Sequence, residues 1–145
     1  EKGQAQFVFM HSVHSVSTDP PIVVFVMGVS GSGKTTVAKA LCTHSNMCFI
    51  EGDDFHPASN REKMSNGVPL CDADRWPWLK LLNEAVNRKL HLESQSVVVA
   101  CSALKSAYRA VLIEGLSETE YAFVCLMGPK EVSNQDSAPF YDLFH

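Results

Sequence analysis

The stretch at residues 28–35, which reads GVSGSGKT, is the part of the sequence whose residue types and spacing most clearly suit chemistry. It matches the pattern G-x-x-x-x-G-K-[ST] at every fixed position. In this pattern, glycines let backbone N–H groups approach a polyphosphate, and the start of the next helix adds a partial positive charge. We therefore predict a loop that binds ATP. The residues expected to contact the nucleotide are Gly28, Val29, Ser30, Gly31, Ser32, Gly33, Lys34, Thr35 and Thr36.

Two side chains of this loop have predicted roles of their own. Lys34 is expected to be catalytic, because it would reach the β- and γ-phosphates, and the hydroxyl of Thr35 is expected to bind Mg²⁺. The alternative is a glycine-rich turn without a ligand. The flanking sequence disfavours that alternative, since the apolar run at residues 22–27 predicts a buried strand and residues 34–45 predict a helix.

An acidic cluster follows the next predicted strand, residues 47–50. Ligands gather at the carboxyl ends of parallel strands, so this cluster should lie on the same edge of the sheet as the phosphate loop. Phosphoryl transfer benefits from a carboxylate that takes the proton of the acceptor hydroxyl, and Asp53 is our candidate. Glu51 and Asp54 could support magnesium or tune Asp53. The alternative is an acidic loop that only starts a helix.

Several basic side chains could bind the acceptor. Arg75, Lys105 and Arg109 are predicted in loops or early helix turns, where they could pair with a carboxylate or a phosphate, although each could equally be a solvated charge. His56, beside Pro57, could hydrogen-bond a sugar hydroxyl, or be structural.

The remaining sequence alternates between predicted helices and strands. The predicted helices cover residues 58–65, a segment capped by Asp72 or Asp74 with Pro77 in its first turn, and residues 103–114 capped by Ser102. The predicted strands cover residues 97–101 and 121–127. This alternation predicts an α/β fold with a mostly parallel sheet. We expect a flexible segment at 1–21, a kinase domain at 22–127 and an irregular tail at 128–145.

Composition narrows the function further. At 145 residues and 46% apolar content, the chain is expected to form one domain with a substantial core. Its net charge of −4 argues against a nucleic-acid partner, and no apolar run reaches the roughly 20 residues of a membrane span. The five cysteines include no C-x-x-C pair, which is typical of reduced residues. An Asn-Lys-x-Asp segment, as in GTPases, is absent from the sequence.

With these residues in view, the sequence resembles the gluconate kinase (gluconokinase) family of small P-loop sugar-acid kinases. The resemblance covers roughly residues 22–127 and rests on four segments. These are MGVSGSGKTT at 27–36; GDDFHP at 52–57 with Asn60, Lys63 and Met64; GVPL at 67–70 with Asp72, Asp74, Arg75, Pro77, Trp78 and Leu79; and ACSALK at 100–105 with Tyr108 and Arg109.

The resemblance implies a three-layer P-loop kinase fold and a reaction. That reaction is transfer of the ATP γ-phosphate to the 6-hydroxyl of D-gluconate, in the cytoplasm and often by a homodimer. It places Asp53 at the acceptor and makes Arg75, Lys105 and Arg109 partners for the substrate carboxylate or phosphate.

Two departures from the family pattern are visible. The family's Asp-x-Asp is Glu51-Gly52-Asp53 here, and residues 128–145 lack the arginines of the family's helical lid. We therefore expect a fold without the usual lid and last strand. Three alternatives stay open: a catalytically impaired nucleotide-binding isoform acting through a dimer, a P-loop kinase for another hydroxylated acid such as shikimate, and a fragment that does not fold.

Overall fold

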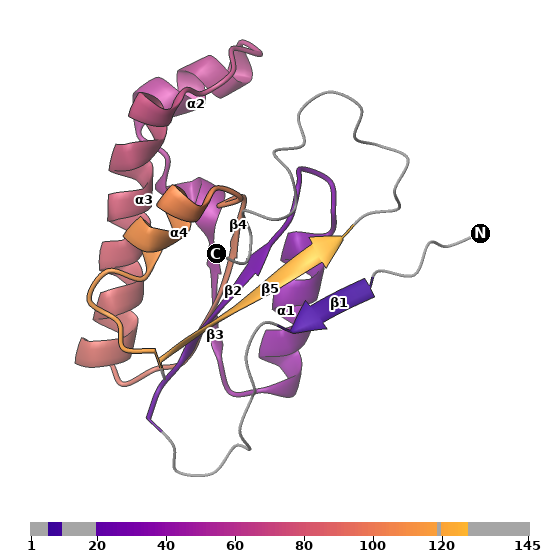
Figure 1. Cartoon of the computed structure of the whole chain (residues 1–145), viewed down its shortest axis with the longest axis vertical. Helices are drawn as coiled ribbons and strands as arrows, with labels where there is room; N and C mark the ends of the chain where they lie inside the picture. Colours follow the sequence, from indigo (N-terminus) through magenta and orange to yellow (C-terminus); the bar gives the residue numbers. More distant parts are fainter. Residues whose placement is uncertain (1–5, 10–19, 119, 128–145) are drawn as a thin grey trace.

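The computed structural model describes residues 6–9, 20–118 and 120–127 (Figure 1). Within these residues a five-stranded sheet has the order β1-β5-β2-β4-β3. The strands β2 (Val23–Met27), β3 (Cys48–Glu51), β4 (Val97–Cys101) and β5 (Tyr121–Met127) run parallel. Every residue of β4 is buried, which explains its continuous apolar sequence. The predicted mostly parallel α/β sheet is confirmed.

The strand β1 (Gln6–Phe9) corrects one sequence-based prediction. These residues fall in the segment 1–21, for which we expected a flexible lead-in, yet they pair antiparallel with β5 from Gln6↔Met127 to Phe9↔Val124. The pairing supplies backbone partners along the outer side of β5, which would otherwise be a sheet edge. The predicted irregular tail at 128–145 lies outside the described residues.

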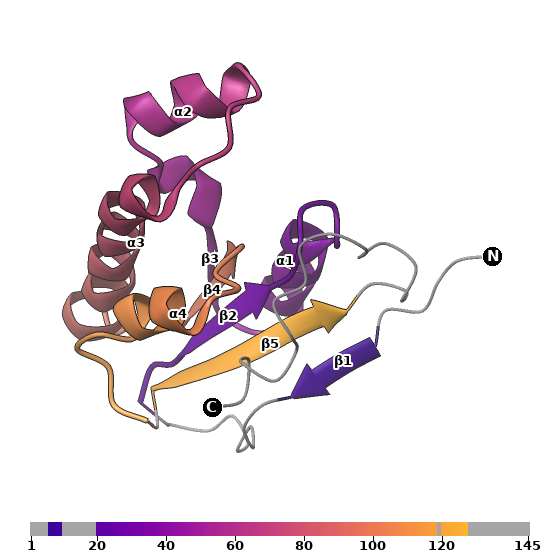
Figure 2. The ribbon, with the colours of Figure 1, turned by 45° about the horizontal axis from the view of Figure 1, so that its top comes forward.

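Helices cover both faces of the sheet (Figure 2). Alternate residues of the strands point to opposite faces, so Val26, Val98 and Val124 pack with α1 (Lys34–His44). The other face packs against α3 (Asp72–Asn87) and α4 (Ser106–Leu112) through Val99, Leu82 and Leu112, among others. The resulting three layers agree with the predicted fold. No helix in the described part of the chain is long and apolar enough to cross a membrane.

The connection from β3 to α3 lies at the carboxyl ends of the strands. It contains a 3₁₀ turn, η1 (Gly52–Phe55), and the helix α2 (Ala58–Ser65), which lies beyond the end of α3 (Figure 1). The bounds of α2 match the predicted helix. At its other end α3 continues into a π-helical turn, η2 (Arg88–Leu92).

Two predicted helix starts are wrong. The helix α3 begins at Asp72 after Cys71, whose backbone N–H donates to Asp74 at 3.0 Å, so Pro77 lies inside the helix and not in its first turn. The helix α4 begins at Ser106 and ends at Leu112, with Lys105 and not Ser102 before its first residue. Residues 102–105 stay non-helical, and Ala103 among them is buried in the core.

A hydrogen bond from the core fixes the turn η1. The indole Nε1 of Trp78, on α3, donates to the carbonyl oxygen of Gly52 at 2.7 Å, and Trp78 is fully buried. A Cβ on Gly52 would lie 2.6 Å from the carbonyl oxygen of Ala100, in β4. The glycine therefore lets the turn pack directly on the sheet, with Asp53 at the carboxyl end of β3.

We expect Trp78→Phe to lower the free energy of unfolding by about 2–4 kcal/mol, because it leaves a buried carbonyl without its donor and a small cavity. Trp76→Phe is the matched control, since Trp76 is only partly buried and packs edge-on against Tyr108. It should cost less than about 1 kcal/mol. Denaturant unfolding followed by circular dichroism measures both, and equal losses would contradict the role given to the Trp78 hydrogen bond.

Candidate functional site

The phosphate loop connects β2 to α1 at the carboxyl end of the sheet (Figure 1). Gly31 and Gly33 have φ angles of 77° and 89°, a left-handed conformation that favours glycine. The helix α1 starts at Lys34 with no side-chain cap and no acidic residue in its first turn. Its first backbone N–H groups are therefore available to an anion, and the helix dipole favours one.

A buried hydroxyl inside the loop is a second feature that suits a bound polyphosphate. The hydroxyl of Ser32 is buried and, among the described residues, has no hydrogen-bond partner. A Cβ on Gly28 would lie 2.4 Å from that hydroxyl oxygen. A buried hydroxyl without a partner costs free energy, which a phosphate oxygen accepting its hydrogen bond would recover. Lys34 currently donates to the carbonyl of Val29, at 2.9 Å, on the same loop.

The predicted metal ligand Thr35 has an acidic neighbour. Its hydroxyl donates to a carboxylate oxygen of Glu51, at the end of β3, at 2.7 Å. Within the described ranges no group of three or more His, Cys, Asp or Glu residues could hold a metal by itself. Such a sparse set suits Mg²⁺, which keeps several waters and takes other oxygens from nucleotide phosphates. The sequence predicted Thr35 as the ligand, with Glu51 only as possible support.

Asp53 lies in η1, and its side chain is 61% exposed. Its Oδ1 is 3.7 Å from Nε2 of His56. The interaction with the His56 ring is the main cause that lowers the pKa of Asp53; the charge of Lys34 lowers it further, and partial burial opposes both. Asp53 is therefore an ionised carboxylate near the phosphate loop, as its proposed role as a proton acceptor requires.

His56, for which the sequence allowed either a contact with a sugar hydroxyl or a structural role, is buried. Its ring stacks on Trp78 with centroids 4.3 Å apart and planes 18° from parallel. Its Nδ1 is 3.2 Å from the side-chain nitrogen of Asn60, on α2. These contacts hold the ring beside Asp53 at the edge of the core.

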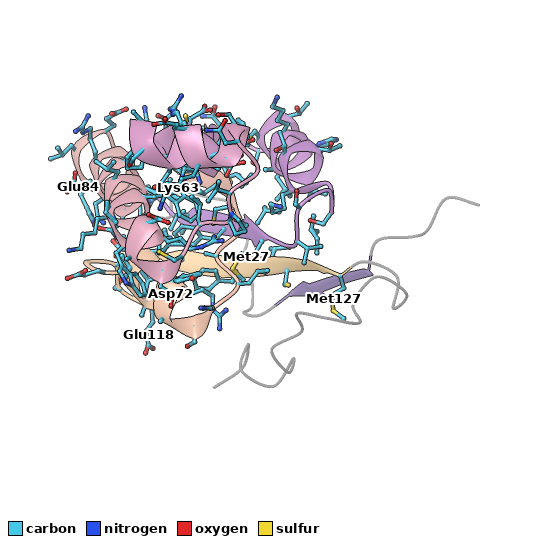
Figure 3. The ribbon with its side chains drawn as sticks, turned by 90° about the horizontal axis from the view of Figure 1, so that it is seen from above. Met27, Lys63, Asp72, Glu84, Glu118 and Met127 are labelled. Carbon is cyan, nitrogen blue, oxygen red and sulfur yellow. The ribbon has the colours of Figure 1, made fainter. Side chains whose placement is uncertain are left out.

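The predicted substrate residues Arg75 and Lys105 lie together around Tyr108. Lys105 Nζ is 2.8 Å from a carboxylate oxygen of Asp72, which also accepts a hydrogen bond from the Tyr108 hydroxyl. The Arg75 guanidinium lies 5.7 Å from the Tyr108 ring centroid. Hydrogen bonds from Lys105 and then Tyr108 lower the pKa of Asp72. Figure 3 labels Asp72, at the start of α3, and Met27, at the end of β2.

Arg109, the third predicted basic residue, has a different environment. It is 8% exposed and donates to the carbonyl of Leu104 at 2.7 Å. Burial lowers its pKa. In this structure the guanidinium supports the non-helical segment between β4 and α4, whereas Arg75 and Lys105 belong to the cluster around Tyr108.

Two polar residues of α2 were given no role by residue-level reasoning. Asn60 is 2% exposed and donates to the carbonyl oxygen of Asp74 at 2.8 Å. Lys63 Nζ pairs with the carboxylate of the same residue at 2.8 Å. Both contacts attach α2 to the start of α3. Two features of the sequence point to them: Asn60 and Lys63 are among the residues that carry the family resemblance, and they lie three residues apart on one face of a predicted helix.

Known proteins resemble this chain in sequence and in fold. Residues 23–129 match the family model described as an AAA domain. A probable gluconokinase of Xenopus tropicalis is 51% identical over 94 residues, which are 65% of this chain and 49% of that protein. The thermosensitive gluconokinase of Escherichia coli is 42% identical over 99 residues, 68% of this chain and 52% of that protein.

The chain belongs to the AAA-domain family, and the relatives named above are gluconokinases. A crystal structure of a gluconokinase from Sinorhizobium meliloti, 48% identical, superposes with a TM-score of 0.64 over 75% of this chain and 59% of that one. An unliganded sugar kinase from Janibacter, 45% identical, gives 0.70 over 78% and 64%. The chain spans about half the length of the curated relatives it matches.

We expect acid to remove the contribution of Asp74 to stability. Lys63 is the main cause, and the Cys71 backbone N–H the next, of a pKa lowered from 3.8 to about 2. A carboxyl whose pKa is lower in the folded chain stabilises the fold above its unfolded pKa, and that contribution disappears as the pH falls through the folded value. The difference in unfolding free energy between the parent and Asp74→Asn should thus shrink between about pH 4 and pH 2.

Denaturant unfolding at a series of pH values measures this difference. The exposed Glu118, replaced by Gln, is the control for loss of a surface carboxylate. A gap between parent and Asp74→Asn that stayed constant down to about pH 2 would contradict the assignment.

Proposed function

We propose that this chain binds ATP and D-gluconate and transfers the γ-phosphate of ATP to the 6-hydroxyl of D-gluconate. One observation carries the proposal. The phosphate loop, the Thr35–Glu51 pair and Asp53 converge at the carboxyl ends of β2 and β3, in a chain whose relatives are named gluconokinases. Phosphoryl transfer needs this combination of an anion site, a cation site and a carboxylate.

Each residue has a distinct proposed role. Lys34 and the loop N–H groups hold the phosphates, which requires Lys34 to leave the Val29 carbonyl. Thr35 and Glu51 would hold Mg²⁺, which neutralises phosphate charge when bound. Asp53 takes the proton of the acceptor hydroxyl as that oxygen bonds to the γ-phosphorus and the bond from phosphorus to the leaving oxygen of ADP breaks.

The acceptor side rests on the basic residues. We propose that Arg75 and Lys105 bind the gluconate carboxylate, because they lie together at the start of α3 and α4. The single negative charge of Asp72 neutralises only part of their combined positive charge. Arg109 and His56 are both buried, and they would support the acceptor-binding residues from the interior of the protein. The homodimer and the cytoplasmic location implied by the resemblance stay predictions.

A coupled assay of ADP release tests the kinase. We expect gluconate-dependent turnover by the purified chain, and a fall of about 10²-fold or more in Lys34→Ala and Asp53→Asn, since each removes a group that acts in the transition state. Lys39→Ala, on the same helix but with its charge over the Phe49 ring, is the control and should keep near-parental activity. Turnover with shikimate and none with gluconate would contradict the substrate.

Binding and chemistry are separated by the melting temperature. ATP with Mg²⁺ should stabilise the parent and Asp53→Asn equally and Lys34→Ala much less, because bound ligand stabilises only the folded state. Stabilisation without any turnover would support a nucleotide-binding chain and overturn the proposed kinase activity of this chain alone.

We expect Glu51→Gln to raise the Mg²⁺ concentration needed for half-maximal stabilisation by ATP by about tenfold, the lower end of the effect of losing a partner of a metal site. Glutamine keeps an oxygen for the Thr35 hydroxyl but loses the charge that attracts the cation. Glu51→Asp, which restores the carboxylate, should recover most of the parental requirement. Glu62→Gln, on the exposed surface of α2, is the control. An unchanged Mg²⁺ requirement in Glu51→Gln would rule out this role.

A further inference from the structure

We propose that His56 is a positioning residue whose ring is fixed with its proton on Nε2, so that it donates to the carboxylate of Asp53 and orients that carboxylate toward the acceptor. The inference rests on the proposed function for its effect on turnover. Its structural part, the location of the proton, depends only on the contacts of three elements, η1, α2 and α3.

The first step concerns the orientation of the Asn60 amide. Its Nδ2 lies 2.8 Å from the backbone carbonyl oxygen of Asp74. A carbonyl oxygen only accepts hydrogen bonds, so the group facing it must be the NH₂ and not the oxygen of the amide. Asn60 is 2% exposed, so water does not offer it an alternative arrangement.

The second step transfers this orientation to the imidazole. The same Nδ2 lies 3.2 Å from Nδ1 of His56, and it has a second hydrogen to donate. Nδ1 must therefore be the accepting nitrogen, without a proton. In a neutral imidazole the proton is then on Nε2, which is the nitrogen 3.7 Å from Oδ1 of Asp53.

The third step concerns which partner moves. The His56 side chain is 3% exposed and stacked on Trp78, whose own indole is held by the Gly52 carbonyl. The Asp53 side chain, in the turn η1, is by contrast 61% exposed. A donor distance of 3.7 Å is longer than a hydrogen bond of about 3 Å, so a small rotation of Asp53 closes it. The ring is the fixed reference, and the carboxylate adjusts to it.

Nitrogen NMR of the full chain tests the proton position. Long-range ¹H–¹⁵N spectra distinguish a protonated from an unprotonated Nδ1, and loss of one signal in His56→Gln assigns His56 among the six histidines. We expect an unprotonated Nδ1 in the parent at neutral pH. Asn60→Asp replaces the donor by an acceptor of the same shape and should protonate Nδ1, while the signal of the distant His91 stays unchanged.

Kinetics test the positioning role with two substitutions of opposite character. His56→Phe keeps an aromatic ring on Trp78 but donates no hydrogen bond, and it should lower kcat by about tenfold to a hundredfold with little change in KM for ATP. His56→Gln loses the stack but places an N–H near the position of Nε2, and it should recover most of kcat. A residue needed only for packing would give the reverse order. His91→Gln is the control.

The two parts fail separately. A protonated Nδ1 in the folded parent overturns the inference whatever the enzyme does, and so does a kcat for His56→Phe that exceeds that of His56→Gln. Absence of gluconate-dependent turnover in the parent overturns the proposed function. In that case the carboxyl ¹³C signal of Asp53 at constant pH decides the inference: it should move in His56→Phe and return in His56→Gln, and no movement in either variant overturns it.

Discussion

The hydrogen bond from the Trp78 indole to the Gly52 carbonyl connects the hydrophobic core to the polar edge of the sheet. Among the strands of the described residues, β3 lies at an edge of the sheet, with β4 as its neighbour. The close approach of Gly52 to β4 and the hydrogen bond from the indole fix the turn that follows β3. A larger residue at position 52 would force the turn away from β4, and Asp53 would move with it.

The site consists of two halves with different origins. The phosphate loop belongs to a central strand and is defined by its own backbone, because left-handed glycines and an uncapped helix start are local features. The proposed acceptor half follows the edge strand β3 and depends on distant residues of α2 and α3. The hydrogen bond between Thr35 and Glu51 joins the halves directly. A cation held there would respond to the relative position of β2 and β3.

This difference explains what the sequence could predict. The phosphate loop, the parallel strands and α2 follow from short-range patterns, and their predicted positions agree with the structure. The pairing of β1 depends on a strand more than 100 residues away in the chain, and no local pattern encodes it. The start of α3 was ambiguous because Asp72 and Asp74 are both good caps, and Asp74 instead accepts from Cys71. The burial of His56 and Arg109 depends on packing that the periodicity of the sequence does not reveal.

The acidic residues at the carboxyl ends of the strands fall into two groups, which differ in their interaction partners. At the start of α3, Asp72 pairs with Lys105 and Asp74 pairs with Lys63. These ion pairs hold α2, α3 and α4 together. Glu51 interacts with the hydroxyl of Thr35, and Asp53 faces Nε2 of His56, the nitrogen to which we assign the proton. Neutral donors orient a carboxylate without cancelling its charge. Glu51 and Asp53 therefore keep the negative charge that the proposed binding of a cation and of a proton requires. The charges of Asp72 and Asp74 instead stabilise the structure through their ion pairs.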